Sequence, residues 1–241
     1  MTTSISRRTI AALLPVFLLA TGCATVEKTP LSVESKQKIR TIAVVAVPEP
    51  EKYFLNPAPT PGGQALYMFG ALGGLVLGGI EATRAKNATD EFTASVSTTN
   101  PDVAEHWNES VLASLQSRGY AVTKVPPLPM LTDGKKVDCN SVSGKFDAVL
   151  LTTISAGYAV ESAVEPLVHA QVQLLSSSCS DVHFSDAFLY SAKAVGSNTH
   201  IAREAKYSFP SREALLANPG TAKEAMRAGL SEIARKVSSV L

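Results

Sequence analysis

Short apolar runs, separated by polar stretches rich in proline and serine, set the pattern of this chain. Residues 39–47 (IRTIAVVAV) are rich in β-branched side chains and apolar at both odd and even positions, which is typical of a strand covered on two faces. The serine-rich segment 176–181 has the composition of a hairpin connection between two strands. The predicted strands are 39–47, 120–125, 146–160, 167–175 and 182–191.

Two longer segments have the period of an amphipathic helix. In the first, Asn100 suits an N-cap, Pro101 suits the first turn, and Gly119 suits the end. Its apolar face repeats every four residues, at Val103, Trp107, Val111 and Leu115. The second, over 221–240, carries the stripe Met226, Leu230, Ile233, Val237 and Leu241. We expect this stripe to face the core, and a partner-binding helix is the alternative. A short helix is expected within 210–219.

The order of these elements predicts the fold class. Strand 39–47, the helix over 101–119 and strand 120–125 form a βαβ unit, which favours parallel pairing of the two strands. The complete set predicts an α/β (α+β) fold, in which a mixed sheet of about five strands packs against flanking helices. We expect a single domain over residues 39–241, with an insertion at 48–100 after the first strand, because such connections usually take about 2–6 residues.

The insertion at 48–100 has a glycine-rich apolar centre over 65–80 that contains no charged residue. Gly70, Gly74 and Gly78 recur at four-residue spacing, which places them on one stripe if the segment is helical. Two interpretations stay open at this point. Either the segment packs against its own sheet or forms a mobile loop, or it mediates self-association or membrane contact.

The N-terminus has the plan of an export signal. Arg7 and Arg8 precede the apolar run 10–20, and small residues follow it. The signal ends in Leu19-Ala20-Thr21-Gly22-Cys23, which resembles the lipobox of bacterial lipoproteins. A thiol at this position is required because sulfur is the nucleophile that takes up the lipid.

This resemblance implies a lipid anchor and a location. It implies that the signal peptide 1–22 is removed and that Cys23 carries diacylglycerol and an added acyl chain such as palmitate. Two or three buried acyl chains hold a protein durably on a bilayer. Ala24 implies sorting to the outer membrane, with the domain on the periplasmic face. We expect residues 23–38 to be the lipidated end and a polar tether, whose root-mean-square span is about 20 Å.

Three segments of the mature domain carry a second resemblance, which concerns the fold. They are 41–45 (TIAVV), 115–120 (LQSRGY) and 147–150 (DAVL). These segments are similar to the α/β domain in the N-terminal part of TolB. The same domain occurs in curli-secretion-type lipoproteins and in lipoprotein activators of peptidoglycan synthases. The resemblance implies a fold, and function has to be argued from other features.

Charge and cysteine content narrow the kinds of partner and site that we expect. The chain has 22 basic and 21 acidic residues, and two of the basic residues lie in the signal, so the mature protein is close to neutral. A near-neutral balance gives no electrostatic reason to expect nucleic acid as a partner. Cys139 and Cys179 would enter the oxidising periplasm, where a cysteine pair more often forms a disulfide than a metal site. We therefore expect a disulfide between them and no metal.

No sequence motif predicts catalysis. The four histidines are scattered, and neither Gly-x-Ser-x-Gly nor a phosphate-binding loop occurs in the sequence. We therefore expect no catalytic residue and no cofactor, and we expect His106 at the boundary of its helix. The expected function is a non-enzymatic, outer-membrane-anchored accessory lipoprotein that binds an envelope-assembly or secretion partner. Two alternatives stay open: a subunit of an oligomeric outer-membrane secretion channel, and a small-molecule or glycan-binding lipoprotein.

Overall fold

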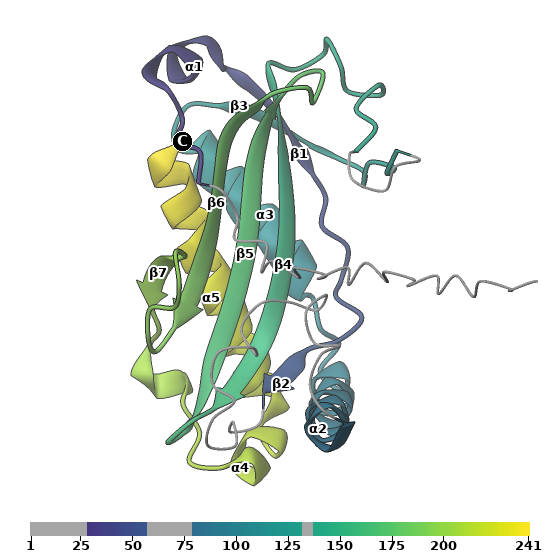
Figure 1. Ribbon diagram of the computed structural model, residues 1–241, viewed down its shortest axis with the longest axis vertical. Coiled ribbons are helices and arrows are strands. Elements are labelled where there is room, and N and C mark those ends of the chain that lie inside the picture. Colours follow the sequence, from purple (N-terminus) through teal and green to yellow (C-terminus); the bar gives the residue numbers. More distant parts are fainter. Residues whose placement is uncertain (1–27, 57–78, 132–136) are drawn as a thin grey trace, which may run out of the picture.

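The computed structural model describes residues 28–56, 79–131 and 137–241, and within these ranges a mixed sheet is packed against helices (Figure 1). The strands are β1 (Thr41–Val45), β2 (Phe54–Asn56), β3 (Ala121–Val125), β4 (Ala148–Val160), β5 (Val164–Ser176), β6 (Val182–Ser191) and β7 (Thr199–Ala202). The helices are α1 (Val33–Lys38), α2 (Gly79–Ser97), α3 (Val103–Gln116), α4 (Arg212–Leu216) and α5 (Pro219–Val240), with a 3₁₀ turn η2 (Ala205–Tyr207). The strand order is β3-β1-β4-β5-β6-β7, and β2 pairs with β4.

The expected α/β fold class and its βαβ unit are confirmed. Strands β1 and β3 are parallel and in register from Thr41 opposite Ala121 to Val45 opposite Val125. Helix α3 lies between them in the chain and packs on β3. Strand β1 is covered on both faces, as expected, because Ile42 and Val44 belong to the main core and Ala43 belongs to a smaller apolar cluster with Val149.

The central part of the sheet is an antiparallel meander of long strands. Strands β4 and β5 pair along their whole length, from Ala148 opposite Ser176 to Val160 opposite Val164. The expected hairpin at 176–181 is confirmed, because the N–H of Ser176 donates to the carbonyl of Asp181 at 2.9 Å. Strand β6 then pairs antiparallel with β5, and β7 pairs parallel with β6.

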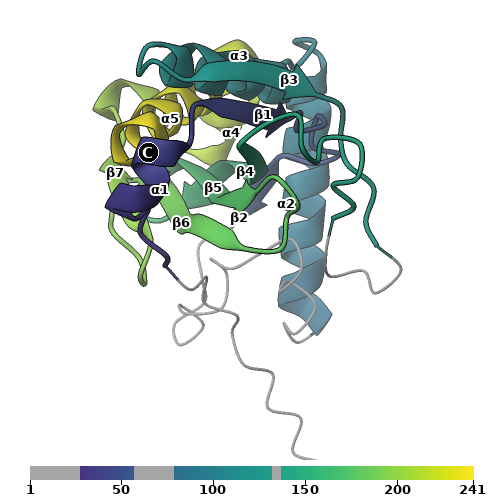
Figure 2. The same ribbon diagram turned by 90° about the horizontal axis from the view of Figure 1, so that it is seen from above.

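Helices α3 and α5 lie side by side over one face of the sheet (Figures 1 and 2). The apolar stripe predicted for the last helix is buried, and its members are Met226, Leu230, Ile233, Val237 and Leu241. The stripe of α3 is buried in the same core, and its largest side chain, Trp107, is fully buried. The stripe of α5 therefore faces the core, as expected, and is not free to bind a partner.

Besides the 3₁₀ turn η2, four elements lie where the sequence predicted none: α1, α2, β2 and β7. Strands β2 and β7 have three and four residues, too few for a period-two pattern to stand out. They extend the expected sheet of about five strands to seven. Within α2, a stripe of Ala88, Phe92 and Val96 is buried. Strand β2 approaches Gly157 of β4 so closely that a Cβ there would collide with the backbone of Phe54.

Helix boundaries also differ from the sequence prediction. Asn100 is not the N-cap, because its φ of 51° places it in the left-handed region and α3 begins at Val103. Helix α5 begins at Pro219, two residues before the predicted start. Part of the tether expected over 23–38 is instead structured, because residues 33–38 form α1 with Ser32 as its cap. The short helix expected within 210–219 is confirmed as α4, and Ser211 caps it.

None of the helices in the described residues combines the length and the apolar character that crossing a membrane requires.

Candidate functional site

Four residues singled out in the sequence lie outside the described residues: Cys23, Gly70, Gly74 and Gly78. Lipid attachment at Cys23 therefore stays a prediction. The same holds for both interpretations of the glycine stripe.

Cys139 and Cys179 form the expected disulfide, with their Cα atoms 6.1 Å apart. The bridge joins the loop between β3 and β4 to the turn between β5 and β6. Cys139 is buried and belongs to a small apolar cluster with Val142 and Val149, separate from the main core. A covalent bond therefore holds a long loop in which few apolar side chains are buried.

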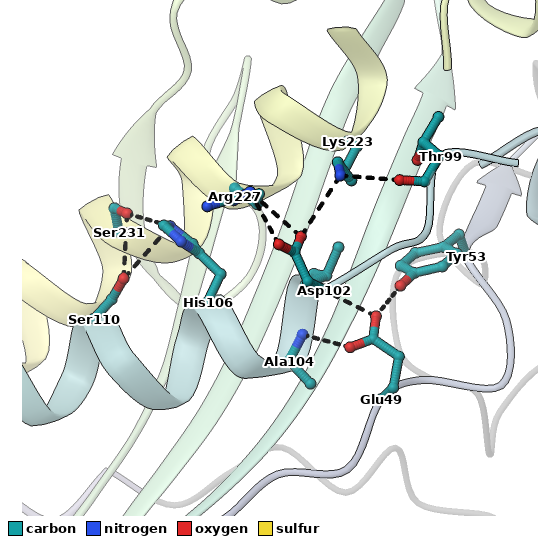
Figure 3. A network of polar contacts seen from close by, with 11 residues as sticks. Glu49, Tyr53, Thr99, Asp102, Ala104, His106, Ser110, Lys223, Arg227 and Ser231 are labelled. Carbon is teal, nitrogen blue, oxygen red and sulfur yellow. Dashed lines mark hydrogen bonds and ion pairs between the residues drawn. The ribbon is translucent and has the colours of Figure 1, made fainter. Parts of the chain in front are cut away.

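A polar network surrounds the start of α3, and the carboxylate of Glu49 is one end of it (Figure 3). This carboxylate accepts hydrogen bonds from the backbone N–H groups of Val103 at 3.2 Å and Ala104 at 2.8 Å. The hydroxyl of Tyr53 donates to the same carboxylate. Burial raises the pKa of Tyr53 well above its usual value, and the hydrogen bond to Glu49 raises it further. The tyrosine therefore stays a neutral donor at any physiological pH.

The second part of the network lies around Asp102, which directly precedes α3 (Figure 3). The guanidinium of Arg227 lies 3.1 Å from one carboxylate oxygen, and the ammonium of Lys223 lies 3.8 Å from the other. Lys223 also donates to the backbone carbonyl of Thr99 at 3.1 Å. Because both cations belong to α5, these contacts tie the segment before α3 to the first half of α5.

The third part joins the first two turns of α3 to the middle of α5. The Nε2 atom of His106 lies 2.8 Å from the hydroxyl of Ser231 and 3.4 Å from that of Ser110 (Figure 3). Burial lowers the pKa of His106 below its usual value of 6.5, and the nearby positive charge of Arg227 lowers it further. The imidazole is therefore neutral at pH 7, half-buried at the helix boundary where the sequence placed it.

We call these groups the α3–α5 seam; its side chains are Glu49, Tyr53, Asp102, His106, Ser110, Lys223, Arg227 and Ser231. A serine–histidine nucleophile needs a third group that orients the imidazole, usually a carboxylate. Among the residues that the structure describes, no carboxylate is hydrogen bonded to this imidazole. The contacts that are present satisfy helix termini and pair charges between α3 and α5. The seam is therefore suited to fixing these helices relative to each other.

Within the described ranges, no group of three or more His, Cys, Asp or Glu side chains could hold a metal ion.

Sequence reasoning missed the seam because its members come from three distant parts of the chain. The signals that did point to it were local. The Asn-Pro-Asp run at 100–102 marked the start of a helix, and His106 was placed at the boundary of that helix. Nothing in the local pattern indicates that the carboxylate of Glu49 returns to that helix start.

Comparison with known proteins shows no family for this chain: no family model matches it, and no curated protein sequence matches it significantly. Among solved structures, protein XCC0632 from Xanthomonas campestris, of family DUF330, is 14% identical over 89% of both chains, with a TM-score of 0.39. A neuraminyllactose-binding hemagglutinin homolog from Helicobacter pylori is 12% identical, with a TM-score of 0.25. That match covers 83% of this chain and 92% of the other. Neither similarity extends to function.

Proposed function

We propose that this chain is a lipoprotein of the bacterial cell envelope, anchored by Cys23 at the periplasmic face of the outer membrane. Its α/β domain acts as a non-enzymatic accessory subunit that binds an envelope-assembly or secretion partner. The observation that carries the proposal is the disulfide between Cys139 and Cys179, together with an N-terminal sequence that has the pattern of an export signal. Disulfides persist in oxidising compartments such as the periplasm. Two independent features, one in the signal and one in the fold, thus favour the same compartment.

The loop that the disulfide holds also presents apolar side chains to solvent. Met130 is 55% exposed and its neighbour Leu131 is 42% exposed. Val182, which follows the turn on the other side of the bridge, is 45% exposed. Large exposed apolar side chains on a restrained loop are suited to contact with another protein.

Lipid attachment is tested by metabolic labelling with an alkyne-tagged palmitate in a Gram-negative host. We expect label in the parent protein and none in Cys23→Ser, with the parent in the outer-membrane fraction. The matched variant Ala24→Asp keeps the lipid and should move to the inner membrane. A Cys23→Ser protein that is processed and fractionates as the parent does would refute the anchor.

Partner binding is tested by in-cell photo-crosslinking. A photoreactive amino acid at Met130 should capture an envelope protein, and the same group at the exposed Ala113 on α3 serves as the matched control. Equal capture at both positions, or none at either, argues against this loop as the contact. Membrane conductance by the reconstituted protein would instead support the channel alternative.

A further inference from the structure

The folded domain holds the chain firmly a few residues after the lipidation position. Thr29 pairs with Ser185 of β6 through two backbone hydrogen bonds, each 2.9 Å long. Next to this pair, the ammonium of Lys28 lies 3.0 Å from the carboxylate of Asp186 and donates to the hydroxyl of Thr199 at 3.0 Å. The segment 28–30 thus extends the sheet along the part of β6 that β7 leaves open.

The side chain that receives Lys28 is largely shielded from water. The side chain of Asp186 is 13% exposed, and its carboxylate also accepts from the hydroxyl of Thr199 at 2.7 Å. After the contact, the chain stays bound to the domain. Leu31 packs against the core, and Ile39 is buried at the far end of α1.

Because of this attachment, little chain is left to separate the domain from the lipid. Five residue steps join Cys23 to Lys28, and an extended chain spans at most about 3.6 Å per residue. The anchor therefore lies within about 18 Å of Lys28. A free tether ending at Ile39 could instead extend to more than about 50 Å.

A linker this short between Cys23 and Lys28 restricts which surface of the domain can face the bilayer. Strand β3, at the other edge, is separated from β6 by β5, β4 and β1, which amounts to about 19 Å along the sheet. Helix α3 lies on the same face of the sheet as α5, but over the β3 edge and away from β6 (Figure 2). Neither β3 nor α3 can reach the membrane surface unless the linker between Cys23 and Lys28 is fully extended.

The geometry points to the β6–β7 edge as the surface that rests against the membrane, with segment 28–30 holding the domain in this orientation. This inference rests on the proposed lipid anchor at Cys23. The partner of the surface is the lipid bilayer that carries the acyl chains.

Charge at this edge is balanced. The basic side chains near it are paired with carboxylates, as Lys28 with Asp186, Lys193 with Glu161, Arg203 with Glu165 and Lys206 with Glu204. A surface without excess positive charge has no electrostatic preference for anionic lipid. The orientation therefore follows from the short linker, and it should be the same on zwitterionic and anionic vesicles.

The orientation is tested on the full lipidated protein in vesicles that contain a headgroup-linked energy acceptor. A fluorescent donor is attached to a cysteine at one of two exposed alanines, as Ala194→Cys between β6 and β7 or as Ala113→Cys on α3. The native thiols do not react with the fluorescent label, since Cys139 and Cys179 are bridged and Cys23 carries the lipid. We expect several-fold greater loss of donor emission at 194 than at 113, with and without anionic lipid. Equal loss at the two positions, or greater loss at 113, overturns the inference.

Three further variants separate the contact at 28–30 from other causes. Thr29→Pro removes the N–H that donates to Ser185, whereas Thr29→Ala keeps it. The difference in the loss of donor emission between positions 194 and 113 should decrease in Thr29→Pro and persist in Thr29→Ala. A flexible Gly-Ser linker of about ten residues inserted after Glu27 leaves the folded domain unchanged, and it should also reduce the difference. A difference that survives both Thr29→Pro and the linker contradicts the role of segment 28–30.

Failure of the anchor itself gives a distinct result. The mass of the Cys23 peptide is measured before reconstitution, and an unmodified cysteine refutes the proposed function directly. A lipidated protein that binds vesicles without the expected difference refutes the orientation and leaves the proposed function standing.

Discussion

The carboxylate of Glu49 caps helix α3, accepting a hydrogen bond of 2.8 Å from the N–H of Ala104, which lies 55 residues further along the chain. The residue at the N-cap position, Asp102, makes no capping hydrogen bond with its side chain and pairs with cations of α5 instead. The first turn of a helix leaves backbone N–H groups without partners and favours a nearby negative charge. Glu49 meets both needs from a different segment, and so it fixes the connection after β1 to the start of α3.

Removing this cap should destabilise the domain. Glu49→Ala leaves the N–H groups of Val103 and Ala104 without their acceptor, and we expect a loss of about 1–2 kcal/mol in the free energy of unfolding. Urea denaturation of the detergent-solubilised protein measures it. Glu51→Ala, at an exposed position two residues away, is the matched control and should change stability little. Equal effects of the two substitutions would contradict the capping role.

The neutral His106 should make stability depend on pH in a defined window. Burial and Arg227 lower its folded pKa below the usual 6.5, so the unfolded chain binds the proton more readily. The contribution of this residue is therefore complete above about pH 6.5 and is lost as the pH falls through the lower folded pKa. Stability measured at a series of pH values should lose this part of its slope in His106→Gln. His200→Gln is the control, and an unchanged slope in His106→Gln would contradict the assignment.

The disulfide should contribute strongly to stability. It closes a separation of 40 residues, and restricting a loop of this length in the unfolded chain corresponds to about 4 kcal/mol. The double variant Cys139→Ser/Cys179→Ser should therefore unfold at a much lower denaturant concentration, and the reduced parent should behave like it. A midpoint that does not change on reduction would show that the loop between β3 and β4 is held by other contacts.

Two glycines of α5 should respond in opposite directions to alanine. At Gly229 a Cβ would lie 2.8 Å from the ring of Tyr190 and 3.0 Å from Val168, so Gly229→Ala should cost about 1–3 kcal/mol. At Gly220 nothing lies within 4 Å of the added atom, so Gly220→Ala should stabilise the helix by up to about 1 kcal/mol. Thermal unfolding of the two variants checks the pair. Destabilisation by both would mean that the close contact of α5 with the sheet is not the cause.

The local sequence pattern was enough to predict the elements whose buried positions recur with a regular period. The stripes through Trp107 and Met226, the strand over 41–45 and the hairpin at 176–181 were all predictable, because burial on one face of a helix or within a sheet imposes a period on neighbouring residues. The pairing of Cys139 with Cys179 was also predictable from the expected compartment. Element type and fold class follow from such local and compositional signals.

Only the tertiary structure decided which distant groups meet. Strands β2 and β7 are too short to show a period and exist because longer strands beside them supply hydrogen-bond partners. The cap from Glu49 and the docking of Lys28 beside Thr199, which is 171 residues away, have no local signature at all. The sequence by itself thus determined the longer strands, the two amphipathic helices and the fold class, since these depend on the pattern of neighbouring residues. The folded chain determined the α3–α5 seam and the attachment of segment 28–30, because both consist of contacts between residues that only the fold brings together.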